Sequence, residues 1–256
     1  MSEPSPLLVE IRGNIQIMTL NRPEARNAVT LEMAEAMVAA LDALDANPAL
    51  SVGIINGAGG TFCAGMDLKG FLQGKRPTVP GRGFCGITMQ PPRKPIIAAV
   101  EGYALAGGFE VVLSCDLIVA SREAKFGLPE VKRGLAAAGG GLLRLPQRMP
   151  YHIAMECILT GDMLSAERAH QNGLINRLTE PGAALDAAIE LANAVAANGP
   201  LSLIASKRVA TESVDWTREE MFDRQAEITN PVFASQDARE GASAFAEKRK
   251  PVWKGV

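Results

Sequence analysis

Two glycine-rich segments carry residue types and spacings that could do chemistry in this chain of 256 residues. The first segment is Phe62–Lys69 and the second is Ala104–Glu110, and each follows a predicted buried strand and leads into a predicted helix. The first backbone N–H groups of a helix have no intrahelical acceptor and favour negative charge. Two such helix starts facing each other would form an oxyanion hole, and glycine would let a substrate approach the backbone closely. Glycine is also common where helices pack on strands, and the spacing alone does not choose between these interpretations.

Two glutamates add acid–base chemistry to this pattern. Glu110 falls about one turn into the helix of the second segment, and Glu130 follows a short predicted strand. Both have apolar sequence neighbours, where a carboxylate is costly unless it is paired or functional. If they share a pocket, desolvation and mutual repulsion would raise the pKa of at least one, giving an acid and a carboxylate together. The alternative is an exposed glutamate or a structural ion pair, for instance of Glu130 with Lys132 or Arg133.

Alternating strand and helix patterns must position these groups, which predicts an α/β fold. The sequence predicts a hairpin at 7–12 and 15–20, a helix at 30–46, strands at 52–56, 95–100, 116–120 and 124–126, and a helix at 107–114. A short helix is expected near 66, and residues 73–83 are expected to form a mobile surface loop or lid. After residue 139 the pattern becomes mostly helical, with helices predicted at 139–148, 151–160, 165–171, 182–197, 201–213, 217–228 and 236–247, and a brief strand at 174–177. We therefore expect a β/α core over residues 1–199 and a helical region over residues 200–256.

Composition excludes several classes of function. A formal net charge of −2 argues against binding of nucleic acid through bulk charge, and two histidines argue against a His-rich metal site. No run of 18 apolar residues is present, so no membrane span is expected, and residues 1–6 lack the features of a secretion signal. Four cysteines without a C-x-x-C pair fit a reducing cytoplasm, and Cys63 is interpreted as a small buried apolar residue rather than a nucleophile.

An ordered set of motifs covers nearly the whole chain, and together it resembles the crotonase superfamily, the enoyl-CoA hydratase/isomerase group. This resemblance implies a crotonase-type spiral of strand–strand–helix units with a helical C-terminal oligomerisation region. It also implies a homotrimer or homohexamer that binds acyl-CoA thioesters, with no cofactor beyond the coenzyme A of the substrate. The motifs are Leu20–Pro23, Asn27–Ala28, Phe62–Leu68, Lys94–Val100, Glu101–Glu110, Cys115–Asp116, Phe126–Glu130, Leu159–Gly161, Gly173–Leu174 and Glu240–Arg249.

The resemblance assigns roles at matching positions. The backbone N–H groups of Met66 and Gly107 would hold the thioester oxygen as an enolate develops. Glu110 would hold and activate the water that attacks C3, and Glu130 would exchange the proton at C2, although the two roles could be shared or swapped. No metal is implied. The residues implied to line or adjoin the coenzyme A site are Ala25, Arg26, Ala28, Ala64, Asp67, Leu68 and Lys69.

Both glutamates together favour an enoyl-CoA hydratase, because isomerases of the superfamily commonly manage with one. The alternatives are carnitinyl-CoA dehydration, enoyl-CoA isomerisation or non-catalytic binding of acyl-CoA. Three departures from the frequent pattern stand out: Ala106 replaces a glycine, Glu101 replaces an asparagine, and Gly134–Gly139 lacks a Pro-Gly pair. The methyl of Ala106 is expected to be tolerable, and the last segment to reshape the acyl pocket. Basic residues near the C-terminus are expected either to reach coenzyme A or to form a solvated tail; these are Lys248, Arg249, Lys250 and Lys254.

Overall fold

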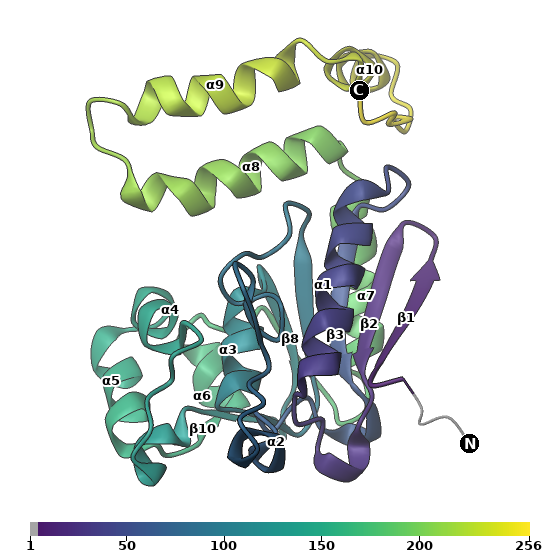
Figure 1. Cartoon of the computed structure of the whole chain (residues 1–256). Coiled ribbons are helices and arrows are strands. Elements are labelled where there is room, and N and C mark those ends of the chain that lie inside the picture. Colours follow the sequence, from purple (N-terminus) through teal and green to yellow (C-terminus); the bar gives the residue numbers. More distant parts are fainter. Residues whose placement is uncertain (1–4) are drawn as a thin grey trace.

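The core is built on a six-stranded sheet in the order β1-β2-β3-β6-β8-β11, as seen in a computed structural model that describes residues 5–256 (Figure 1). Only β1 runs antiparallel to its neighbour. The expectation about a secretion signal in residues 1–6 falls mostly outside the described residues. The strands are β1 (Leu7–Arg12), β2 (Ile15–Leu20), β3 (Val52–Gly57), β6 (Ile96–Val100), β8 (Leu117–Ser121) and β11 (Arg177–Thr179).

Helices cover both faces of this sheet, which explains why β3 and β6 are apolar almost without interruption. Helix α1 (Leu31–Ala46) lies on one face and α7 (Ala184–Ala196) on the other (Figure 1). The buried residues of α7 are all alanines spaced four apart, and such small side chains let the helix approach the sheet closely. They are Ala184, Ala188, Ala192 and Ala196.

A second, three-stranded sheet leads into the segments that hold Gly107 and Glu130. It has the order β10-β9-β7 and contains β7 (Tyr103–Leu105), β9 (Lys125–Gly127) and β10 (Leu164–Ser165). Successive strands therefore alternate between the two sheets: β6 lies in the first and β7 in the second, followed by α3 (Gly107–Ser114), and β8 and β9 repeat the alternation. This repeated crossing builds a spiral of strand–strand–helix units.

The remaining elements are short or peripheral. The α-helices are α2 (Leu68–Leu72), α4 (Gly141–Arg148), α5 (Tyr151–Thr160), α6 (Ala166–Gln171), α8 (Pro200–Glu212), α9 (Met221–Phe233) and α10 (Gln236–Ala246). Four 3₁₀ turns are Pro23–Ala25, Ala58–Gly60, Pro129–Arg133 and Ser213–Asp215, and a small hairpin joins β4 (Thr78–Val79) to β5 (Gly83–Phe84).

Three predicted segments differ from the structure. Residues 73–83 include part of the β4–β5 hairpin, and Arg82 forms an ion pair with Asp42 of α1, so this segment is not simply a loop. The strand predicted at 174–177 begins only at Arg177, and Leu174 and Ile175, whose apolar character suggested a strand, are buried in the core before it. The helix predicted at 217–228 runs instead over α9, which begins after a turn at 218–220 and includes Pro231 in its last turn.

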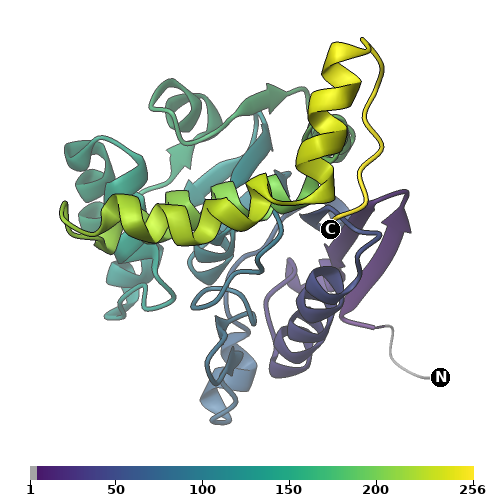
Figure 2. The same cartoon turned by 90° about the horizontal axis from the view of Figure 1, so that it is seen from above.

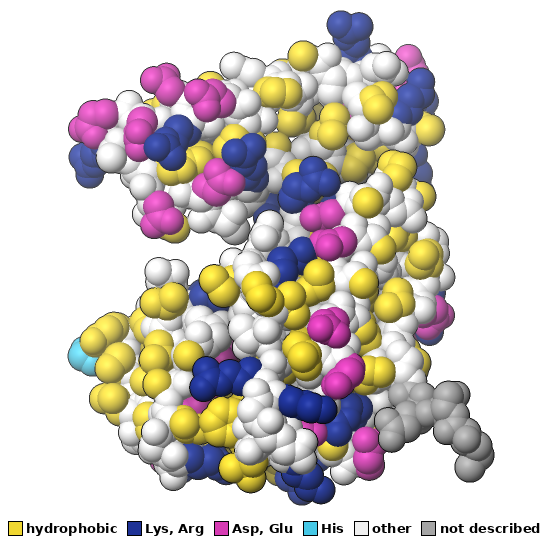
Figure 3. Space-filling view, in the orientation of Figure 1, with side chains coloured by type: hydrophobic (Ala, Val, Ile, Leu, Met, Phe, Trp, Pro, Cys, Tyr) yellow, Lys and Arg dark blue, Asp and Glu magenta, His cyan; other side chains and the backbone are white. Residues whose placement is uncertain are grey.

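Helices α8, α9 and α10 form a separate layer beyond the sheet (Figures 1 and 2). The chain bends by 104° between α7 and α8, and the space-filling view shows a deep notch between this layer and the body around α4 and α5 (Figure 3). Within the described residues, no single helix is long and apolar enough to cross a membrane, although α7 and α8 pass that test as a bent pair.

The C-terminal tail is tied to the helices rather than free in solvent. Arg249 forms a bidentate ion pair with Glu240, at 2.6 and 2.9 Å, and the carboxylate of Asp237 accepts the backbone N–H groups of Lys254 and Gly255. The indole of Trp253 donates to the carbonyl of Ala197 at the end of α7. The four basic residues of this run are exposed, so the tail is solvated, but Arg249 and the backbone at Lys254 anchor it to α10.

Glu101, one of the unusual residues of the sequence, caps α7. Its Oε1 accepts the N–H of Ala184 at 3.0 Å, and a carboxylate also suits the positive end of the helix dipole. We predict that Glu101→Ala lowers the free energy of unfolding by about 1 kcal/mol, whereas Glu101→Gln retains most of it, because the amide keeps an acceptor oxygen. Urea unfolding at a fixed protein concentration measures both variants, and an equal loss in both would contradict the capping role.

Candidate active site

The two glycine-rich segments lie side by side. The N–H of Cys63 donates to the carbonyl of Tyr103 at 2.8 Å, and the N–H of Leu105 donates to the carbonyl of Cys63 at 2.9 Å. Glycines permit this proximity: a Cβ on Gly108 would lie 2.3 Å from the carbonyl oxygen of Cys63, and a Cβ on Gly65 would lie 3.0 Å from the methyl of Ala106. The sequence prediction that the two segments face each other therefore agrees with the geometry.

The two predicted oxyanion donors lie on these facing segments. Gly107 is the first residue of α3, so its N–H has no partner within the helix. Met66 pairs with Val29 in a parallel bridge. The N–H of Val29 donates to the carbonyl of Gly65, and the N–H of Asp67 donates to the carbonyl of Val29. The N–H of Met66 therefore points away from Val29. The ring of Phe84 covers Gly107, since a Cβ there would lie 2.4 Å from its Cζ.

Ala106 adopts a backbone conformation that L-residues rarely occupy, with φ 51° and ψ −127°. The frequent glycine at this position would take it without strain, whereas a side chain costs about 1–3 kcal/mol. The methyl was expected to be tolerable because the donor is Gly107 and not Ala106. The structure shows that the energetic cost of Ala106 arises from its backbone conformation, immediately before the N–H of Gly107.

Glu110 is buried, at 4% exposure, against Gly139 and Gly141, which together form the seat of its carboxylate. Its Oε1 accepts the N–H of Gly141 at 2.9 Å. A Cβ on Gly139 would lie 2.4 Å from Oε2, so only glycine leaves room for the carboxylate there. Burial raises the pKa of Glu110, opposed by the N–H groups of Gly141 and Gly139 and by the charge of Arg144.

Glu130 lies in the 3₁₀ turn after β9, partly buried, and its Oε2 is fully enclosed without a hydrogen-bond partner. The ion pairs suggested by its neighbours do not form: Lys132 pairs with Asp162 at 2.5 Å, and Arg133 donates to the carbonyl of Pro129. Burial, followed by the nearby charge of Glu110, raises the pKa of Glu130 to about 6. The two carboxyl groups therefore share one low-dielectric region, as the sequence suggested they could.

The residues implied for coenzyme A come together from two segments. The N–H of Ala64 donates to the carbonyl of Arg26 at 3.0 Å, which joins the segment of Ala25 and Ala28 to that of Leu68 and Lys69. Arg26, Leu68 and Lys69 are exposed there. Asp67 is already engaged, because its carboxylate caps α2 and pairs with Arg22 at 2.9 Å. Its side chain is therefore a structural part of this region.

Sequence reasoning missed three contributors to the site. Phe84, Gly139 and Arg144 touch Gly107, Glu110 and Gly140 respectively. The glycine run 139–141 at the start of the helix predicted over 139–148 was the one available signal, because consecutive glycines mark a close approach; the helix itself begins at Gly141. Cys63 is fully buried, and burial raises the pKa of its thiol to about 12, in line with its interpretation as an apolar residue. The described residues contain no cluster of His, Cys, Asp and Glu that could hold a metal ion.

Comparisons of the sequence and of the structure with known proteins point to the same family. Residues 10–256 match the family model described as enoyl-CoA hydratase/isomerase. An enoyl-CoA hydratase of Mycobacterium tuberculosis is 44% identical over 255 residues, covering 95% of this chain and 94% of the relative. A carnitinyl-CoA dehydratase of Salmonella arizonae is 41% identical over 252 residues, covering 95% and 96%. The structure of an enoyl-CoA hydratase from Mycobacterium marinum, 60% identical, superposes with a TM-score of 0.97 and covers 99% of this chain and 100% of that one. These likenesses confirm the predicted fold class.

The strain at Ala106 generates a stability prediction. Ala106→Gly should raise the free energy of unfolding by about 1 kcal/mol, because relief of strain outweighs the greater chain entropy of glycine. Ala104→Gly is the matched control: it is buried on β7 without a positive φ, so the same substitution should lower stability by about 1 kcal/mol. Denaturant unfolding compares the two, and similar losses in both would show that Ala106 is unstrained.

Proposed function

Because the chain belongs to the enoyl-CoA hydratase/isomerase family, we propose that it adds water reversibly across the 2,3 double bond of a 2-enoyl-CoA thioester. The observation that carries this proposal is the pair of the buried Glu110 and the partly buried Glu130, two carboxyl groups with raised pKa values in one region beside the facing glycine-rich segments. Hydration needs one group to accept a proton from water and another to deliver a proton to carbon, and such a pair supplies both.

In the proposed reaction the N–H groups of Met66 and Gly107 bind the thioester oxygen and stabilise the negative charge that develops on it. Glu110, ionised, takes a proton from the water whose oxygen bonds to C3. Glu130, protonated, gives its proton to C2, so the product gains the elements of one water. Burial raises the pKa of both residues, so this division of roles rests on the family resemblance. No metal or further cofactor takes part in this proposal.

We propose that coenzyme A lies along the joined segments around Arg26 and Ala64, with Lys69 at its exposed edge. Backbone groups and exposed cations there suit phosphates and adenine. The four free, buried cysteines support a reducing compartment, which we propose to be the cytoplasm.

Carnitinyl-CoA dehydration is the second candidate function, favoured by the dehydratase relative. A trimethylammonium group is best recognised by aromatic rings or acids, and only 5% of the chain is aromatic. Enoyl-CoA isomerisation and non-catalytic binding of acyl-CoA account less well for two shielded glutamates. A panel of 2-enoyl-CoA esters of rising length, with carnitinyl and branched esters, separates these functions: hydration lowers the enoyl thioester absorbance, whereas dehydration of the carnitinyl ester raises it.

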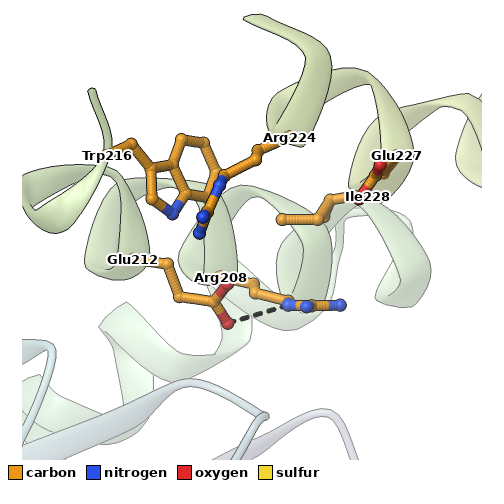
Figure 4. A pocket seen from close by; sticks show the side chains of 6 residues that line it. All are labelled: Arg208, Glu212, Trp216, Arg224, Glu227 and Ile228. Carbon is orange, nitrogen blue, oxygen red and sulfur yellow. Dashed lines mark hydrogen bonds and ion pairs between the residues drawn. The ribbon is translucent and has the colours of Figure 1, made fainter. Parts of the chain in front are cut away.

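We propose that the chain forms a homotrimer or a hexamer of paired trimers, in which the layer of α8, α9 and α10 contacts a neighbouring copy. Helix α9 has no buried residue, and Phe222 and Phe233, about three turns apart on one face, are 72% and 79% exposed. A hollow of about 340 Å³ lies between α8 and α9, lined mostly by charged side chains, such as Arg208 and Glu212, and by the indole of Trp216 (Figure 4). These helices bury too little apolar surface to hold this arrangement alone.

We predict that Glu110→Gln and Glu130→Gln each lower kcat for crotonyl-CoA about 10²–10⁴-fold, while the affinity for coenzyme A persists. Exchange of the C2 proton with deuterated solvent should fall more in Glu130→Gln, since this residue serves C2. Glu123→Gln, an exposed glutamate near the same turn, is the control and should retain activity. Near-normal turnover in both test variants would refute the mechanism, and an inactive wild type on the whole panel would favour a binding protein.

We predict that sedimentation velocity finds trimers or hexamers and that Phe222→Glu with Phe233→Glu releases monomers, because charges would replace the apolar face of α9. Ile11→Glu on the edge strand β1 is the control, since Ile11 is 57% exposed and distant in the fold. A wild-type monomer, or equal dissociation by the control, would contradict the assignment of this face.

A further inference from the structure

Arg144 joins two parts of the site that the sequence leaves separate. It lies in the first turn of α4, three residues after the glycine run 139–141, and is partly buried. Its Nη2 donates to the carbonyl of Thr88 at 2.6 Å and its Nη1 donates to the carbonyl of Gly139 at 3.5 Å. None of the ion pairs among residues 5–256 includes Arg144. The partly buried guanidinium of Arg144 therefore donates to carbonyl groups and forms no ion pair with a carboxylate of the described residues.

The glycine run separates Arg144 from Glu110. A Cβ on Gly140 would lie 2.2 Å from Nη1 of Arg144, and a Cβ on Gly139 would lie 2.4 Å from Oε2 of Glu110. The guanidinium and the carboxylate thus rest on adjacent residues of the same short segment. Gly141 completes the seat through its N–H bond to Glu110. A shift of this segment would move the carboxylate directly.

On its other side, Arg144 reaches the residues that cover the oxyanion donor. Thr88, whose carbonyl accepts from Arg144, also accepts the N–H of Phe84 at its Oγ1, at 2.9 Å. The ring of Phe84 lies over Gly107. One side chain therefore braces both the seat of Glu110 and the segment that shields the thioester oxygen site.

We propose that Arg144 is a positioning residue for the proposed hydration, which holds the glycine run against Glu110 and supplies the positive charge that faces this carboxylate. This inference rests on the proposed function but concerns a residue that does not touch the reacting atoms. A buried carboxylate without such a cation would favour its protonated form and could not accept a proton from water.

The surrounding charges agree with this role. Burial raises the pKa of Glu110, and Arg144 is the cation that opposes this increase, while Glu130 is the acid on the other side. Arg148 lies one turn further along α4 and repels Arg144, and Cys115 lies nearby as an un-ionised thiol whose pKa is raised by burial. Arg148 donates to the carbonyls of Leu113 and Cys115 at the end of α3. It therefore links α4 to α3 at the C-terminal end of α3 and forms no hydrogen bond with the glycine run 139–141 that adjoins Glu110.

Arg148 therefore provides a matched control. We expect Arg144→Gln to shift the acidic limb of the pH profile of kcat/KM for crotonyl-CoA upward by about 1 unit, because the pKa of Glu110 rises without the cation. It should also lower kcat roughly 10–100-fold with a smaller change in KM, since the carboxylate is misplaced. Arg144→Lys should restore the acidic limb but only part of kcat, because lysine keeps the charge and loses the two-pronged contact. Arg148→Gln should lower the melting temperature and leave the acidic limb in place.

An unchanged acidic limb and kcat in Arg144→Gln, with a loss of stability like that of Arg148→Gln, would overturn the proposal. A separate readout distinguishes this failure from failure of the proposed function. If the wild type hydrates no ester of the panel, ¹³C NMR titration of labelled glutamate still measures the pKa of Glu110, assigned with Glu110→Gln. A higher pKa for Glu110 in Arg144→Gln than in the wild type and in Arg148→Gln would support the electrostatic role, and equal values would refute it.

Discussion

The site depends on backbone segments approaching each other more closely than any side chain would allow. Gly108 lies against the carbonyl of Cys63, and Gly65 lies against Leu105 and Ala106, so the start of α3 and the loop after β3 become neighbours. Donors held in this way are main-chain N–H groups fixed by the fold, and they need no reorganisation when negative charge appears on a bound oxygen. Ala106, directly before Gly107, accepts this close approach in a strained backbone conformation.

The same constraint determines the acid–base chemistry. Gly139 and Gly141 leave space for the carboxylate of Glu110, and the resulting enclosure withdraws both Glu110 and Glu130 from water. Desolvation then raises both pKa values, and the residual charge of one carboxylate raises the other further. In the proposed mechanism glycine thus acts twice: it frees backbone donors for the substrate, and it permits burial of the carboxyl groups that would exchange protons with the substrate.

Much of this arrangement could be predicted from local sequence, because strand alternation and helix periodicity are short-range signals. The hairpin of β1 and β2, the strand at β6 and the helix at α3 follow their predicted ranges. The strand near residue 175 and the start of α9 could not be predicted, because Leu174 and Ile175 are placed by tertiary burial and α9 has no buried face to mark it. The pairing of Glu110 with Glu130 required a family resemblance, since nothing local shows that Lys132 prefers Asp162. Arg144 escaped notice because its partners are carbonyl groups, which have no sequence signature.

In the proposed mechanism the oxygen of the thioester is bound by main-chain groups, which do not distinguish one acyl group from another, and relatives of this chain carry the names of different reactions. Selection among acyl groups must then come from side chains beyond C3. In this chain the segment 134–138 presents mostly exposed small residues and Leu135, immediately before the glycine run that seats Glu110. Under the proposed mechanism, changes in segment 134–138 would alter the acyl environment without touching the donors, whereas changes in the glycines that follow would displace the carboxylate of Glu110. The residues proposed to select the acyl group would then lie only a few positions from those proposed to position Glu110, and Arg144, which donates to the carbonyl of Gly139, would act on the second group.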